Sequence, residues 1–151
     1  MHELVLPNDT NVLGNILGGR VMHYMDICAA MSAYKHARSP VVTASVDQLN
    51  FLAPATVGDM LILKSSVNFT GKTSMEVGVR IESENSISGK KNHTASAYLT
   101  FVSLDNNRKP KKIEKVKPEK VKPETENQIR RFNKAKLRKE ARKKNIKDVR
   151  L

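Results

Sequence analysis

The residues with the clearest chemical potential lie in the segment NVLGNILGGRVMHYMD, which spans residues 11–26. Asp26 is a lone carboxylate in a largely apolar run, and it follows the glycine pair Gly18 and Gly19 by about two helical turns. A carboxylate can act as a general base toward water, or it can attack a carbonyl carbon directly. Glycines at the first turn of a helix leave unpaired N–H groups open to a ligand, and the helix dipole favours negative charge there. The segment therefore contains a candidate base or nucleophile and a candidate oxyanion hole.

Each of these residues also has a structural interpretation. Asp26 could be a buried acid that is hydrogen-bonded across an interface, and the glycine pair could form only a tight turn. Asn15 could cap the helix. His23 and His36 are better explained as packing or surface residues than as catalysts, and Cys28 as a small core residue. No His, Cys and Asp cluster has the spacing of metal ligands, so we expect no metal site.

Hydrophobic periodicity predicts one long helix and five strands. A helix is expected over residues 18–36, because Met22, Met25, Ala29 and Ala33 recur at helical spacing and the sequence ARSP follows. The expected strands span residues 2–6, 41–52, 59–69, 74–84 and 94–104. A curved antiparallel sheet around a central helix would bury both apolar surfaces, which is an α+β fold. The helix is apolar nearly all round, so we expect a second subunit to cover it.

Charge is distributed very unevenly along the 151 residues. Residues 1–105 hold 8 Lys or Arg and 9 Asp or Glu, whereas residues 106–151 hold 19 and 6. The lone cysteine fits a reducing cytosol. No apolar stretch is long enough to span a membrane, and the first residues lack the pattern of a secretion signal. We therefore expect a cytoplasmic domain over residues 1–106 with a basic tail over residues 107–151.

The domain resembles the acyl-CoA thioesterases of the hotdog fold, in which an antiparallel sheet wraps one long helix. That family carries a pattern close to N-x-x-G-N/D-x-x-G-G-x-x-M-x-x-M-D. The matching residues here are Asn11, Gly14, Asn15, Gly18, Gly19, Met22, Met25 and Asp26. The similarity continues through VVTASVDQLNFLAPATVGD and GKTSMEV, and we expect it to cover about residues 5–106, with the basic tail outside it.

The resemblance implies hydrolysis of acyl-CoA, an intermediate of fatty acid metabolism, to a free acid and CoA. Asp26 would be the base or nucleophile, Asn15 its polar partner, and the N–H groups of Gly18 and Gly19 the oxyanion hole. In the family the paired residues come from opposite subunits, so we expect a dimer with interfacial sites, or a hexamer built as a trimer of dimers. CoA takes part as substrate and product only, and no cofactor is expected.

The resemblance also implies a site for the CoA phosphates in the segment GKTS. Lys72 beside Ser74 would supply the cation, and Gly71 and Thr73 would supply backbone and hydroxyl donors. The simpler interpretation is a solvated hairpin turn with a lysine at its tip.

The tail begins with KVKPE repeated at residues 115–119 and 120–124, which predicts an extended spacer. Thr125 and Gln128 form a capping-box pattern, so a helix can begin there. Ile129, Phe132 and Leu137 are too few to anchor that helix firmly. The tail could contact nucleic acid or an anionic surface, or it could be a solvated, partly disordered extension.

Two other functions remain open. A hotdog oligomer could serve only to present a nucleic-acid-binding tail. An enoyl-CoA hydratase on the same fold would need a histidine about one helical turn or more beyond the aspartate, and Ala30 and Met31 argue against it.

Overall fold

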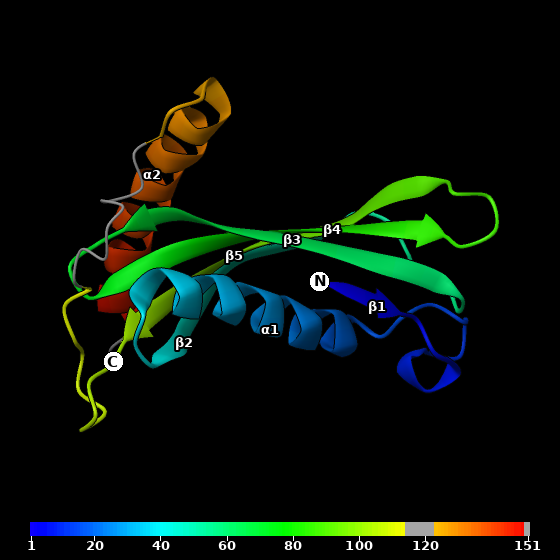
Figure 1. The fold of residues 1–151 in the computed structure, drawn as a ribbon, viewed down its shortest axis with the longest axis horizontal. Coiled ribbons are helices and arrows are strands. Elements are labelled where there is room, and N and C mark those ends of the chain that lie inside the picture. Colours follow the sequence, from blue (N-terminus) through cyan, green and yellow to red (C-terminus); the bar gives the residue numbers. More distant parts are fainter. Residues whose placement is uncertain (114–122, 150–151) are drawn as a thin grey trace.

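The computed structural model describes residues 1–113 and 123–149, which form one sheet, two long helices and a short 3-10 helix (Figure 1). The strands form a five-stranded sheet with the order β1-β3-β4-β5-β2, and all paired neighbours are antiparallel. The elements are β1 (His2–Leu4), η1 (Pro7–Asp9), α1 (Gly18–Ala37), β2 (Val41–Phe51), β3 (Asp59–Thr70), β4 (Ser74–Asn85), β5 (Lys91–Ser103) and α2 (Glu126–Val149). The predicted hotdog arrangement is confirmed, because α1 lies along one face of this sheet (Figure 1).

Helix α1 begins and ends within one residue of the predicted bounds. It ends where Arg38 adopts a left-handed conformation with φ of 50°. Small side chains dominate the side that faces the sheet and allow a close approach. The buried residues are Val21, Met25, Cys28, Ala29, Ala33 and Ala37. Several other apolar side chains of α1 stay exposed in the single chain, among them Met22, Ile27, Met31 and Tyr34.

The central strands alternate as the sequence predicts. Met75, Val77, Val79 and Ile81 of β4 are buried on the side of α1, together with Ala95, Ala97, Leu99 and Phe101 of β5. Strand β5 begins at Lys91, three residues before the predicted start, because residues 91–93 pair with the end of β4. These two strands supply most of the core beneath α1.

Strand β2 departs from simple alternation. Its pairing with β5 shifts register twice, between Thr43 and Ser45 and between Val46 and Gln48. Each shift changes which side chains face the helix, as β-bulges do. Since β2 is an edge strand, no described strand pairs with its outer edge, and the Val46 side chain is 49% exposed.

Helix α2 packs against the sheet face opposite α1 (Figure 1). Its start is the predicted capping box, in which Thr125 accepts from the Gln128 N–H and Gln128 accepts from the Thr125 N–H. Phe132 contacts Phe69 with ring centroids 5.5 Å apart, and Ala135 is fully buried. The interpretation of this part of the tail as a free extension is therefore wrong.

Arginines add to this apolar packing an anchoring of α2 that the sequence did not predict. Arg138 donates two hydrogen bonds to Glu76, over 2.7 and 3.0 Å, and its guanidinium lies 3.5 Å from the ring centroid of Tyr98. One turn later, Arg142 pairs with Asp47 over 3.2 Å. Nearly all of the KVKPE repeat lies outside the described residues.

Candidate active site

Asp26 lies in the middle of α1, at the edge of the helix that faces strand β2. Its Oδ1 accepts a hydrogen bond of 2.6 Å from the Thr43 hydroxyl, and no other hydrogen bond to this carboxylate occurs in the described part of the chain. Asp26 is exposed in the single chain. A carboxylate with one oxygen fixed by Thr43 and the other open can act as a base or a nucleophile toward a molecule brought to this surface.

Sequence reasoning did not identify Thr43. Regular alternation along VVTASVDQLNFL would place Thr43 on the polar side of β2, together with Ser45 and Asp47. The first β2 bulge lies at Thr43, and the hydroxyl meets a carboxylate 17 residues away in the chain. No periodic signal in the sequence reports a bulge, so only the register of the folded sheet reveals this pair.

The start of α1 presents the two glycines as predicted. The Leu17 carbonyl accepts from the N–H groups of Arg20 and Val21, while the Gly18 and Gly19 N–H groups have no backbone acceptor among the described residues. A Cβ added at Gly19 would meet nothing within 4 Å, so the backbone there is open to a ligand. A Cβ at Gly18 would meet the Phe51 ring at 3.4 Å.

The loop before α1 contains two asparagines, Asn11 and Asn15. The Asn11 side-chain oxygen accepts from the Leu13 N–H at 2.9 Å and from the Asn15 N–H at 3.2 Å, which holds a tight turn with Gly14 at a φ of 75°. Asn15 does not cap α1, because the capping position is Leu17 and no side chain bonds there. The capping interpretation of Asn15 is therefore wrong.

A pocket of about 380 Å³ opens at this end of α1. Its walls are mainly apolar, from Ile16, Val21 and residues 51–55, and Asn15, Gly18 and Thr94 also line it. The pocket adjoins the exposed backbone of the glycine pair. An apolar cavity beside free N–H donors has the form of a site for a carbonyl group that carries a hydrocarbon chain.

One chain does not bring Asp26 to these glycines. Eight residues of helix separate Gly18 from Asp26, which is roughly 12 Å along the axis. Asn15 lies further away, before the helix begins. A site that uses both Asp26 and the glycine pair therefore needs a second α1 beside the first.

The segment Gly71, Lys72, Thr73 and Ser74 forms the turn between β3 and β4, at the other end of α1 (Figure 1). The Gly71 N–H donates to the Ser74 carbonyl over 2.7 Å, and Lys72 is exposed. Helix α2 brings Lys139 close to Gly71, which sequence reasoning did not foresee. Burial, followed by the charges of Lys143 and Arg142, lowers the pKa of Lys139. The turn is thus flanked by cations from α2 and is not a purely solvated hairpin.

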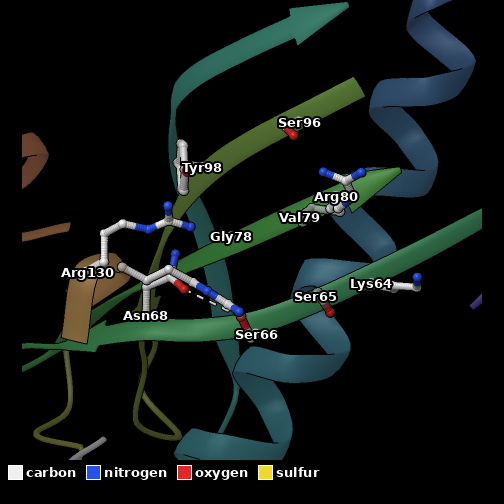
Figure 2. Close-up of a pocket in the computed structure, with 11 residues that line it drawn as sticks. Lys64, Ser65, Ser66, Asn68, Gly78, Val79, Arg80, Ser96, Tyr98 and Arg130 are labelled. Carbon is white, nitrogen blue, oxygen red and sulfur yellow. Dashed lines mark hydrogen bonds between the residues drawn. The ribbon is translucent and has the colours of Figure 1, made fainter. Parts of the chain in front are cut away.

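A second hollow, of about 400 Å³, lies where α2 crosses the outer face of the sheet. Figure 2 shows the Arg130 side chain reaching from α2 toward Tyr98, with Lys64 and Arg80 farther along the strands. Hydrogen bonds from Lys64 and then from Arg80 lower the pKa of Glu82 to about 2. This hollow is cationic, in contrast to the apolar pocket at the start of α1.

Comparison with known proteins identifies the family. The model of the thioesterase superfamily matches residues 13–90, a range that includes the glycine pair, Asp26, Thr43 and the turn at residues 71–74. The chain belongs to the thioesterase superfamily.

Relatives of this thioesterase-superfamily chain align over nearly its whole length. The "Uncharacterized acyl-CoA thioester hydrolase YkhA" of Bacillus subtilis is 41% identical over 139 residues, which cover 92% of this chain and 78% of that protein. An apo-hexameric acyl-CoA thioesterase is 47% identical with a TM-score of 0.89, covering 97% of this chain and 90% of that one. The Staphylococcus aureus acyl-CoA hydrolase, solved with butyryl-CoA, CoA and CoA disulfide, is 37% identical with a TM-score of 0.88, covering 98% and 87%.

These alignments extend well beyond residue 106. The prediction that the family resemblance ends there and leaves the basic tail outside is therefore wrong. The similarity continues into the tail because α2 packs on the sheet as part of the same structural unit.

The described residues of this superfamily member lack two kinds of feature. No helix there is long and apolar enough to cross a membrane. No group of three or more His, Cys, Asp or Glu side chains there could hold a metal ion. Cys28 is a buried free thiol that packs in the core.

Proposed function

We propose that this chain hydrolyses acyl-CoA thioesters to a free carboxylic acid and CoA. The observation that carries the proposal is the Asp26 carboxylate, which Thr43 holds at 2.6 Å on an open surface of α1. Membership of the thioesterase superfamily supplies the reaction class. The names of the Bacillus subtilis and Staphylococcus aureus relatives support acyl-CoA as the substrate class.

Asp26 attacks the thioester carbon through an activated water or directly. The Thr43 hydroxyl fixes Oδ1, so Oδ2 is the oxygen that faces the reactants. A positioned general base contributes about 10²–10⁴ in rate. Direct attack would instead give a mixed anhydride, which a water molecule then cleaves. Both routes use the same carboxylate and expel the same thiolate.

The Gly18 and Gly19 N–H groups bind the carbonyl oxygen as it gains negative charge. Since they lie roughly 12 Å from Asp26 of the same chain, the complete site uses Asp26 of one subunit and the glycines of the other. Apolar side chains of α1 that stay exposed, including Met22, Ile27 and Met31, support burial against a second copy. Hexameric assembly is described for related thioesterases, including one from Yersinia pestis, and favours a trimer of such dimers here.

The amide that completes the site is better assigned to Asn11 than to Asn15. The Staphylococcus aureus hydrolase was solved as three separate alanine variants, of an asparagine, an aspartate and a threonine. In that chain, fifteen residues separate the asparagine from the aspartate and seventeen separate the aspartate from the threonine. Asn11, Asp26 and Thr43 have the same two spacings, whereas Asn15 does not.

The CoA phosphates bind at the turn formed by Gly71, Lys72, Thr73 and Ser74. Lys139 of α2 adds a positive charge beside this turn, which supports phosphate binding there. The reaction needs no metal or redox group, and CoA enters only as part of the substrate. A buried free cysteine agrees with a reducing, cytoplasmic location.

Mixed oligomers test the shared site. Asp26→Asn and Asn11→Ala, each assembled alone, should release almost no CoA thiol from an acyl-CoA panel, whereas Asn15→Ala should keep most of the activity. Co-assembly of the two inactive variants should recover about a quarter of the wild-type sites, because a mixed dimer holds one intact site. Asp26→Asn alone, taken through the same co-assembly procedure, is the matched control. Full inactivity of the mixture would exclude a site shared between subunits.

Contact of the basic tail with nucleic acid or anionic surfaces is a second candidate role. It is supported by cations of α2 that remain exposed, including Arg130, Lys134 and Lys144. Binding of RNA by the full chain with a steep dependence on salt, without thiol release from any acyl-CoA, would favour this role over hydrolysis.

A further inference from the structure

The outer face of the sheet carries a hollow that the proposed hydrolysis does not use. Its volume is about 400 Å³, and sites for small molecules span roughly 300–1,000 Å³. Strands β3, β4 and β5 form the floor of the hollow, and α2 forms one wall (Figure 2). Gly78 lies in this floor without a side chain, and a Cβ there would meet Asn68 Nδ2 at 2.6 Å. The hollow therefore has room for a ligand between the strands and the helix.

Four cationic side chains line this hollow, and none of the described residues in its lining is acidic. The cations are Lys64, Arg80, Arg130 and Arg131. Glu82 is the one described carboxylate that pairs with any of them, because it accepts from Lys64 over 2.7 Å and from Arg80 over 2.8 Å. Arg131 donates over 3.3 Å to the Ser66 hydroxyl, which is neutral. Four positive charges and one negative charge leave an excess of three positive charges at the hollow.

This excess of positive charge indicates an anionic ligand with more than one phosphate group. A phosphate group carries about two negative charges at neutral pH, so a single group does not match the excess. Three of the four cations are arginines, whose planar guanidinium groups bind phosphate oxygens through two parallel N–H donors. Two of the cations belong to strands β3 and β4, and the other two belong to α2. Linked phosphate groups can contact both pairs at once.

We propose that the hollow binds a small oligophosphate, either inorganic or part of a nucleotide, and that this ligand joins α2 to the sheet. Helix α1, which carries Asp26, packs on the opposite face of the sheet, so the site is separate from the candidate active site (Figure 1). Undocking of α2 would take Arg130 and Arg131 away from the strands, so the ligand binds only the docked helix. A ligand that binds only one of two states stabilises that state.

Isothermal titration calorimetry of the full chain with phosphate and pyrophosphate, in the absence of divalent metal ions, tests the site. Pyrophosphate should bind about tenfold or more tightly than phosphate, and Arg130→Met combined with Arg131→Met should weaken its binding by about tenfold or more. Lys134→Met combined with Lys144→Met is the matched control, because it removes the same charge from exposed positions of α2 outside the hollow. The control should weaken binding by less than about threefold, since salt screens exposed charges at a distance. Equal weakening in the two double variants, or equal binding of phosphate and pyrophosphate, overturns the site.

Comparison of ADP with pyrophosphate identifies the source of the phosphates. Tighter binding of ADP would assign a nucleotide to the hollow. Equal or weaker binding of ADP would assign an inorganic oligophosphate. Either result supports the site, provided that the double arginine variant weakens the binding of the preferred ligand.

Hydrogen exchange tests the link between the ligand and α2. With pyrophosphate at ten times its Kd, the amides of α2 should exchange about elevenfold more slowly, because opening of the helix requires release of the ligand. Unchanged exchange at saturation would overturn the link.

The kinetics of thiol release test whether the hollow is separate from the acyl-CoA site. The double arginine variant should leave KM for butyryl-CoA within about twofold of the wild-type value. A rise in KM of about tenfold would instead place CoA in the hollow and overturn a separate site. Pyrophosphate binding without thiol release from any acyl-CoA would refute the proposed hydrolysis and leave the oligophosphate site standing.

Discussion

Replacing Arg138 with methionine should loosen α2 from the sheet. Arg138 donates two hydrogen bonds to Glu76, whose side chain is only 6% exposed. Removing one partner of a buried ion pair costs about 3–5 kcal/mol, because the remaining charge stays buried without compensation. The Arg138 side chain is 18% exposed and Asn68 still donates to Glu76 over 3.2 Å, so a loss of about 2–3 kcal/mol is expected.

Hydrogen exchange measures this loss of stability in α2, where it should first appear. Helix α2 should open locally before the domain unfolds, so its backbone amides over residues 126–144 should exchange about 30- to 150-fold faster. Lys134→Met is the matched control, because Lys134 is exposed on the same helix and forms no hydrogen bond within the described residues. Adding Glu76→Gln to Arg138→Met should restore part of the protection, since the buried charge is then gone. Equal exchange in Arg138→Met and Lys134→Met would refute the ion pair as the anchor of α2.

Four further predictions follow from single contacts. Thr43→Val should slow thiol release about tenfold without a change in circular dichroism, because only the hydrogen bond to Asp26 is lost. Gly19→Ala should raise the unfolding free energy by about 0.5 kcal/mol yet lower kcat, since the added methyl group meets no protein atom but occupies the path of the ligand. The pKa of Glu82 is about 2 in the folded chain and 4.5 ordinarily. Its contribution to the free energy of unfolding is therefore complete above pH 4.5 and is lost as the pH falls toward 2. The urea midpoint of Glu82→Gln should not show this fall over the same pH range. Burial lowers the pKa of His36 from 6.5, so stability should fall as the pH drops below that value, and His36→Gln should flatten the urea midpoint over about pH 7 to 5.

Periodicity predicted the parts of the fold that repeat regularly. Helix α1 and strands β3 and β4 begin at the predicted residues, because uninterrupted spacings of 3.6 and 2 define them. The bulges of β2 and β5 could not be predicted, since a bulge depends on the register between two strands and not on the composition of one. One β2 bulge directly follows Thr43, which pairs with Asp26, and the β5 bulge lies at the buried Thr94.

The docking of α2 was missed for a different reason. Counting Ile129, Phe132 and Leu137 as its anchors treats arginine as a solvated charge. A guanidinium can instead form a fork with a carboxylate and lie on an aromatic ring, as Arg138 does with Glu76 and Tyr98. Sequence shows that such cations exist, but their partners lie on strands far away in the chain.

The placement of Arg138 and Arg142 has a consequence for chains that lack α2. Glu76 and Asp47 meet their counter-charges 62 and 95 residues later in the chain, on α2. A nascent or clipped chain that stops near residue 106 would carry both acids on a surface without those neutralising partners. The free energy of unfolding of such a fragment would fall more at neutral pH and low salt than that of the chain that includes α2. Helix α2 is thus the closing piece of one electrostatic unit, and a chain without it would have an unbalanced face.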